Sequence, residues 1–379
     1  MTAPRGNHIA EWYGHRVYPE VAATERAQAD QRGGHCPFLT DVTREHRNCV
    51  KAANSQGVCT VSSVSRDRGR QDWLVCPIRT LDLDLIDDVT RRLFGYEPAT
   101  KVKIIPAPVL SDQGTRAAFT AAVEAGTPAV VYFQTQLGGE ITLGSTPRSP
   151  EFSFDATMVE VLADDTGGLR VGRYGIFEIQ TMDYHGSYRH AVSNLRDGLR
   201  LHPDDFHETL EKRPDWLSDR MEGPNISNVF KRTFYQMMFK FQIGAHDSSA
   251  GCVFAIPRPV WDSWQRHLAA PELVDRGDGT WQLGDSAPDA DGKTLAWIYV
   301  LDLDVSATES PNALKVWRRI ATDAASVSHY ALDLAPEAAL AEGGSVDRLM
   351  ATIRARLAVY LPEILAAPPM LPVNPNRPT

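Results

Sequence analysis

The chain has 379 residues and a formal net charge of −9, with 43% hydrophobic and 23% charged residues, a composition typical of globular proteins. It contains no run that approaches the ~18 continuous apolar residues of a membrane helix, and its first residues lack the apolar core of a signal peptide, so we expect neither a membrane span nor export. The net charge argues against a protein that coats nucleic acid indiscriminately, although a local basic site is compatible with it.

Four of the five cysteines, Cys36, Cys49, Cys59 and Cys76, lie within the first 80 residues. The residues between them show weak hydrophobic periodicity, which predicts a small loop-rich module that cannot build a core unaided. Four thiolates are a natural tetrahedral ligand set for zinc or iron. The spacing C-x12-C-x9-C-x16-C lacks the paired knuckles of a zinc ribbon, and the alternative is four unrelated buried thiols. We predict a metal site because the module has no other source of stability, and we predict that Cys252 is a core thiol.

Downstream of residue 80 the sequence alternates between helical and extended patterns. Helices are predicted at 81–100, 112–125, 188–200, 225–243, 257–269 and 344–360. Strands are predicted at 101–107, 128–134, 151–163, 169–180, 252–257 and 295–305. A tight turn joins the two long strands, 151–163 and 169–180, so we expect a β-hairpin there.

Acidic residues mark this hairpin. Asp155 lies on its first strand, and Glu178 and Gln180, two residues apart on the second, point to one face. Pairing can bring Asp155 opposite them, and two converging carboxylates repel each other unless a cation lies between them. Magnesium suits such a site. The pattern resembles the PD-(D/E)xK nuclease core, with Gln180 where lysine is usual, although D…ExQ alone is a weak motif.

Basic residues follow the hairpin. His185 and Arg189 come immediately after it, so we expect them near the carboxylates. At that place they would be able to touch DNA bound at the site. Lys231, Arg232 and Lys240 lie on the predicted helix 225–243, in a stretch with no acidic residue. That helix either faces phosphates or is a core helix with solvated lysines outside, and the sequence favours neither interpretation.

Longer stretches are more specific than these spacings. They are YGHRVYPE at 13–20, DWLVCP at 72–77, LGGE at 137–140, SPEFSFD at 149–155, RYGIFEIQTMDYHGSYRHAV at 173–192, EGPNISNVFKRTFYQM at 222–237 and FAIP at 254–257. Through them the chain resembles the NotI-like family of rare-cutting type II restriction endonucleases. The resemblance fades in the first ten residues, around 200–220 and over roughly the last 80 residues.

The resemblance implies an α/β fold with a PD-(D/E)xK core, a mixed central sheet flanked by helices, behind an N-terminal four-cysteine metal module. From the change of pattern along the chain we expect a metal-binding and DNA-recognition region at 1–100, a catalytic core at 101–270 and a C-terminal α/β extension packed on the core at 271–379. The resemblance implies a homodimeric, Mg²⁺-dependent endonuclease that cuts double-stranded DNA. The active-site residues would be Glu140, Asp155, Glu178 and Gln180. The four cysteines would hold iron, with zinc as the alternative.

The resemblance also implies a target. A two-fold dimer reads a palindrome, here one centred on GGCC, either CGGCCG or GCGGCCGC, cut to leave 5′ overhangs. Because arginine is the usual reader of guanine, the candidate base readers are Arg173, Asp183, His185 and Arg189, which flank the catalytic strand. A bacterial cytoplasmic location and a host methyltransferase that protects the same site are expected with this function.

Two other function classes are compatible with these residues. The chain could be a metal-stapled DNA-binding protein whose nuclease core has decayed, although a decayed core would be expected to lose at least one carboxylate. It could also be a glycoside hydrolase that uses two of Glu140, Asp155 and Glu178, which would need aromatic sugar platforms and no metal. Plasmid cleavage with and without Mg²⁺ separates all three.

Overall fold

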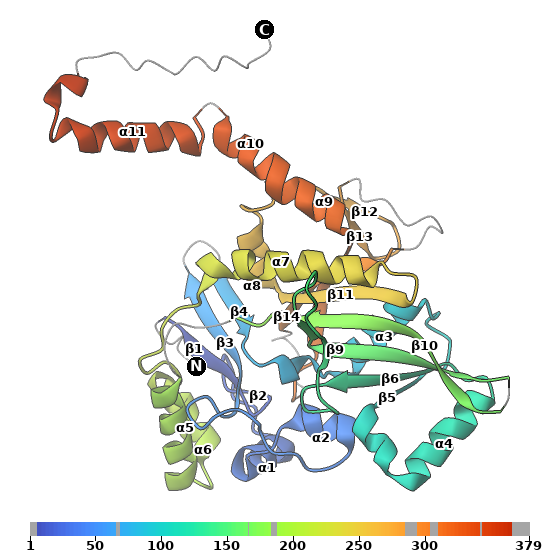
Figure 1. Ribbon diagram of the computed structural model, residues 1–379. Helices are drawn as coiled ribbons and strands as arrows, with labels where there is room; N and C mark the ends of the chain where they lie inside the picture. Colours follow the sequence, from blue (N-terminus) through green and yellow to red (C-terminus); the bar gives the residue numbers. More distant parts are fainter. Residues whose placement is uncertain are drawn as a thin grey trace.

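A nine-stranded mixed sheet organises the molecule, in the order β12-β13-β15-β14-β11-β10-β9-β6-β5 (Figure 1). The computed structural model describes residues 6–65, 69–165, 167–182, 188–284, 294–303, 310–341 and 343–365. The strands of this sheet are β5 (Lys103–Pro106), β6 (Ala129–Gln134), β9 (Ala156–Ala163), β10 (Leu169–Ile179), β11 (Ser249–Pro257), β12 (Leu273–Asp275), β13 (Trp281–Leu283), β14 (Ala296–Leu303) and β15 (Leu314–Thr322). The α/β class with a mixed sheet flanked by helices is thus as predicted.

The centre of the sheet is parallel and the flanks are largely antiparallel. Strand β11 pairs in parallel with both β10 and β14, whereas β9 pairs antiparallel with β10 and with β6. All nine residues of β11 are buried, as expected of a parallel strand with both faces covered. The predicted hairpin exists as β9 and β10.

Helices cover both faces of the sheet. They are α3 (Leu83–Phe94), α4 (Gln113–Glu124), α7 (Ile226–Gly244) and α8 (Arg258–Trp264). On one face α3 packs against Phe177 and Val253, and on the other α7 packs against Ile176 and Phe254. Because neighbouring residues of a strand point to opposite faces, Glu178 belongs with Ile176 to the face covered by α7.

The first 80 residues contain more regular structure than predicted. A second sheet, in the order β2-β1-β3-β4, comprises β1 (His8–Trp12), β2 (His15–Arg16), β3 (Val58–Ser65) and β4 (Gly69–Leu74). The helices α1 (Glu25–Gly33), α2 (Pro37–Thr43), α5 (Arg189–Leu201) and α6 (Phe206–Lys212) surround it. The loop-rich prediction was wrong, because Trp12, Val61 and Leu195 share one buried cluster that joins this sheet to α5 and α6.

A buried hydrogen bond and a partly exposed ion pair join the first 100 residues to β15 of the large sheet. Arg79 is fully buried, pairs with Glu11 at 2.9 Å and donates to the carbonyl oxygen of Asn312, just before β15. Asp88 of α3 pairs with Arg319 of β15 at 2.9 Å. The N-terminal region and β15 are therefore packed into one unit.

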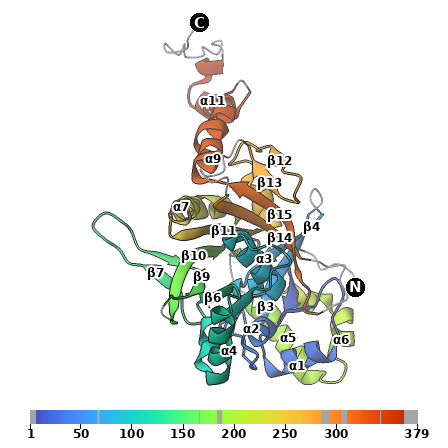
Figure 2. The same ribbon diagram turned by 90° about the vertical axis from the view of Figure 1, so that its right-hand side faces the viewer.

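The region 271–379 is divided between core and arm. Strands β12 to β15 belong to the large sheet, and α9 (Ala324–Ser328) packs against α7 through the buried residues Ala324 and Val327. Beyond α9, the helices α10 (Ala335–Leu340) and α11 (Ser345–Ala358) lead away from the sheet as an arm, and α11 buries none of its residues (Figures 1 and 2). Within the part of the chain that the structure describes, no helix is both long and apolar enough to cross a bilayer.

Candidate functional site

Asp155 occupies a break between two strands. The predicted strand 151–163 is interrupted: β8 (Phe152–Phe154) pairs with β7 (Ile141–Leu143) in a hairpin that projects from the sheet, and β9 begins only at Ala156 (Figure 2). In the break, Asp155 Oδ2 accepts a hydrogen bond of 2.9 Å from the backbone N–H of Ile179. Its own backbone N–H lies 3.4 Å from Glu178 Oε2. Asp155 and Glu178 are thus brought together, as the sequence predicted.

Glu178 is a charged side chain in an apolar setting. It is 5% exposed and lies on the second-last position of β10, next to Phe254 of β11. Its Oε1 contacts the Nζ of Lys240, which reaches in from α7 and is 3% exposed. One carboxylate oxygen is therefore held by a lysine, and the other faces Asp155.

Burial and crowding of charge perturb both carboxylates. Burial and the charge of Asp155 raise the pKa of Glu178 to about 8, although Lys240 opposes the shift. Burial likewise raises the pKa of Asp155, and the charge of Glu140 adds to this effect, whereas the hydrogen bond from Ile179 and the charge of Lys240 lower it. Perturbed carboxylates that share a site are typical of functional centres.

Glu140 and Gln180 lie at the margins of this pair. Glu140 is exposed, accepts a hydrogen bond from the Thr135 hydroxyl and is close enough to influence the pKa of Asp155. Gln180 follows the end of β10, where its backbone N–H donates to the carbonyl oxygen of Ala255 at 2.9 Å. Its side-chain amide donates to the carbonyl oxygen of Thr181 at 2.6 Å.

Neither of the two interpretations of the helix 225–243 describes Lys240, which is buried and faces neither a phosphate-accessible surface nor solvent. Lys240 shares the inner face of α7 with the buried residues Met237 and Phe241, and its ammonium group meets Glu178 rather than solvent. Lys231 and Arg232, on the same helix, are exposed. The i, i+3 spacing of Met237 and Lys240 is the only signal in the sequence that could have placed this lysine inside.

Two of the four candidate base readers, Arg173 and Arg189, lie within the described residues. Arg173 lies five residues before Glu178, roughly 17 Å along the strand, and its guanidinium lies 3.5 Å from Glu160. Arg189 is exposed at the start of α5. Asp183 and His185 lie outside the described residues.

The four N-terminal cysteines converge. Cys36 begins α2, Cys59 lies on β3, Cys76 precedes a 3₁₀ turn and Cys49 comes from a loop, yet all four line one small cavity together with Lys51. A hydrogen bond with the Cys59 thiol is the largest influence that lowers the pKa of Cys76. The donor set is thus the soft tetrad that zinc or iron prefers.

Metal-binding geometry, however, is not formed. Among the residues that the structure describes, no group of three or more His, Cys, Asp or Glu side chains is arranged to hold a metal ion, at the cysteines or at the carboxylates. No protein-family model matches the chain, and neither does any curated protein.

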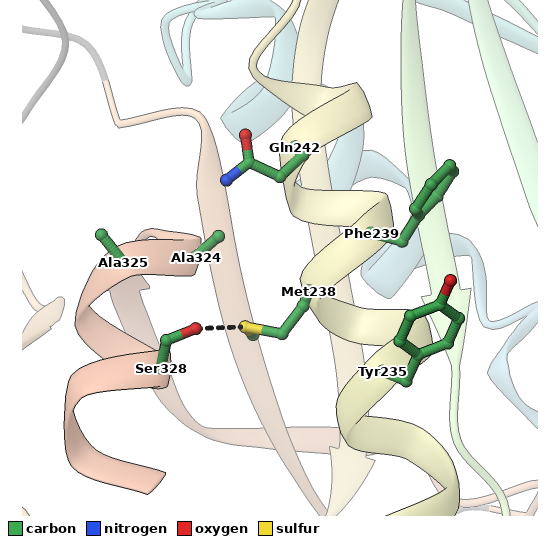
Figure 3. A pocket seen from close by; sticks show the side chains of 7 residues that line it. All are labelled: Tyr235, Met238, Phe239, Gln242, Ala324, Ala325 and Ser328. Carbon is green, nitrogen blue, oxygen red and sulfur yellow. Dashed lines mark hydrogen bonds between the residues drawn. The ribbon is translucent and has the colours of Figure 1, made fainter. Parts of the chain in front are cut away.

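A groove between α7 and α9 is less suited to chemistry. It has a volume of about 290 Å³ and is lined by Tyr235, Met238, Phe239, Gln242, Ala324, Ala325 and Ser328 (Figure 3). Its internal hydrogen bond runs from the Ser328 hydroxyl to the Met238 sulfur at 3.3 Å. None of these residues is a carboxylate, histidine or cysteine, so we place the candidate site at Asp155 and Glu178.

The raised pKa of Glu178 predicts a pH-dependent stability. Between pH 4.5, its ordinary value, and about 8, the folded protein holds a proton that the unfolded chain releases. In magnesium-free buffer the free energy of unfolding is therefore expected to fall as the pH rises through this window, by on the order of a few kcal/mol. Chemical denaturation at a series of pH values measures the slope. The variant Glu178→Gln should flatten it, and an unchanged slope in that variant would contradict the assignment.

Proposed function

We propose that the protein is a type II restriction endonuclease that cuts both strands of DNA in a Mg²⁺-dependent reaction. The observation that carries the proposal is the pair of Asp155 and Glu178, two adjacent carboxylates with raised pKa values at the end of a β-hairpin. The exposed Glu140 beside them supports it, because a third acidic group makes the site still more attractive to a cation.

Asp155 and Glu178, with Glu140, are the residues that would hold magnesium. When bound, Mg²⁺ supplies a Lewis acid that activates water and stabilises the charge that develops on the phosphate. The backbone N–H of Ile179 orients Asp155. On Glu178, one oxygen is held by the protein and the other faces Asp155, so the two carboxylates are oriented before a cation arrives.

The four cysteines would hold a structural metal, which we propose to be iron, with zinc as the alternative. Their support is their convergence on one cavity from four separate segments. Such a metal would tie the start of α2, the loop that carries Cys49 and β3 to Cys76, which follows β4. Its role would be to stabilise the N-terminal region rather than to take part in cleavage.

The proposed target gives a direct test of the whole function. A homodimer is expected to cut a palindrome centred on GGCC, CGGCCG or GCGGCCGC, and to leave 5′ overhangs. Digestion of a plasmid library in Mg²⁺ followed by sequencing of the ends measures both the site and the stagger. The same DNA treated with a methyltransferase specific for that site should resist cutting.

The outcomes separate the alternatives. Blunt ends, or a consensus without a central GGCC, would refute the target while leaving the nuclease activity. Sequence-specific binding without cleavage in Mg²⁺ would indicate a DNA-binding protein with an inactive core. Cleavage of DNA that is independent of divalent metal would contradict the proposed role of Asp155 and Glu178.

A further inference from the structure

Lys240 is a buried lysine on α7 that contacts one of the two carboxylates of the candidate site. It sits on the face of α7 that packs against the sheet, where its neighbours Met237 and Phe241 are apolar and fully or almost fully buried. Its Nζ contacts Glu178 Oε1 and lies 5.8 Å from the centre of the Phe154 ring. The ammonium group is therefore surrounded by the same strand ends that carry the proposed site.

Stability does not account for this pair. Removing two charges from water costs several kcal/mol for each ion, and well-packed apolar residues of similar volume often replace a buried ion pair without loss of stability. Two members of the local set, Asp155 and Glu178, are acidic, and Lys240 opposes the rise of pKa in both. The positive charge of Lys240 thus favours the ionised forms of the two carboxylates, whereas the apolar core around it has no use for a charge.

Gln180 does not supply such a charge. Its side chain is neutral, and its amide donates to the carbonyl oxygen of Thr181. The cation beside Glu178 is instead Lys240 of α7, which lies 62 positions further along the chain. Because Lys240 occupies Oε1, the Oε2 atom of Glu178 is left facing Asp155.

We propose that Lys240 is a positioning residue of the active centre, which fixes the Glu178 carboxylate toward Asp155 and provides a buried positive charge beside the pair. The proposal rests on the endonuclease function proposed above. Lys240 acts through Glu178: it restricts the rotation of that carboxylate and partly offsets the negative charge that the site presents to an incoming phosphate.

The test compares neutral and charged replacements. Lys240→Met fills the same volume without charge, Lys240→Gln is a second neutral variant, and Lys240→Arg keeps the charge. At saturating Mg²⁺ the neutral variants are expected to cleave a plasmid about 10²-fold more slowly, the scale of losing one fixed electrostatic group, with no recovery at higher Mg²⁺. Lys240→Arg should recover at least tenfold of that loss. Lys103→Met, which removes an exposed lysine from the edge strand β5, is the matched control and should cleave normally.

A second measurement separates positioning from general damage to the site. Calorimetric titration with Mn²⁺ should show that Lys240→Met binds the cation at least as tightly as the native protein, because a repelling charge has been removed. Slow cleavage with retained metal binding in folded variants supports the proposal, and a lower Tm does not contradict it, because removal of one partner of a buried ion pair is itself destabilising. It is overturned if the folded neutral variants cleave within threefold of the native rate, if Lys240→Arg is no faster than Lys240→Met, or if metal binding and cleavage are lost together.

Failure of the proposed function would look different. If the native protein cuts no DNA in Mg²⁺, the endonuclease function and the role of Lys240 fall together. If the native protein cuts and the neutral variants cut equally well, only the role of Lys240 falls.

Discussion

Glu178→Ala and Asp155→Ala are each expected to lower Mg²⁺-dependent DNA cleavage by at least about 10³-fold, the loss that follows removal of a principal electrostatic stabiliser. The backbone N–H of Asp155 contacts the Glu178 carboxylate, and burial raises the pKa of both side chains. Because the proposed cation site uses both carboxylates, neither can replace the other. Sequence-specific DNA binding should survive, since the proposed role of the affected residues is to bind the cation rather than the bases. Plasmid nicking and gel shift assays measure the two properties separately.

A matched control lies on the same hairpin. Glu160 of β9 is a partly buried acid that accepts a hydrogen bond of 2.8 Å from the Tyr96 hydroxyl, away from the proposed site. Glu160→Gln should therefore cleave at a rate close to that of the native protein. If Glu178→Ala also cuts at the native rate, the assignment of the active site is wrong.

Cys36→Ser is expected to release the structural metal and to lower stability by several kcal/mol, or on the order of 10 °C in Tm. Cys36 is buried at the start of α2 and faces the cavity that the other three N-terminal cysteines line. Elemental analysis of dialysed native protein should find about one iron or zinc per chain, retained when magnesium is removed. The four thiols should resist labelling until the protein unfolds.

Cys252→Ala provides the comparison for this result. Cys252 is fully buried on β11 within the apolar cluster under α7, so its replacement should cost stability without changing the metal content. Native protein that contains no metal and four freely reactive thiols would end the idea of a structural metal.

The sequence predicted the elements whose signals are local. Helix α3 begins after Asp82, whose carboxylate caps two backbone N–H groups, and ends at Gly95 in a left-handed conformation, within the predicted range 81–100. The two strands of the hairpin were likewise visible from their alternation. The break at Asp155 was not, because the alternation of apolar residues continues through it from Phe154 to Ala156.

The sequence patterns did not indicate which residues far apart in the chain come into contact. The N-terminal sheet was missed because its strands bury polar residues, among them His8, Glu11 and Thr60, which hide the period of two. Asp155 and Glu178 could be paired because one hairpin carries both. Lys240 could not be assigned to them, since nothing in its own helix indicates which strand end it meets.

The order of strands in the large sheet also constrains when the protein becomes complete during synthesis. Strand β11, which supports the end of β10, has β14 as its other neighbour, and β14 is bordered in turn by β15. A nascent chain that stops before Ala296 leaves the edge of β11 unpaired, and one that stops before Leu314 lacks the strand that Arg79 and Asp88 help to anchor. The ribosome must therefore release most of the chain before the carboxylates acquire their final surroundings, and α9, α10 and α11 emerge after that point.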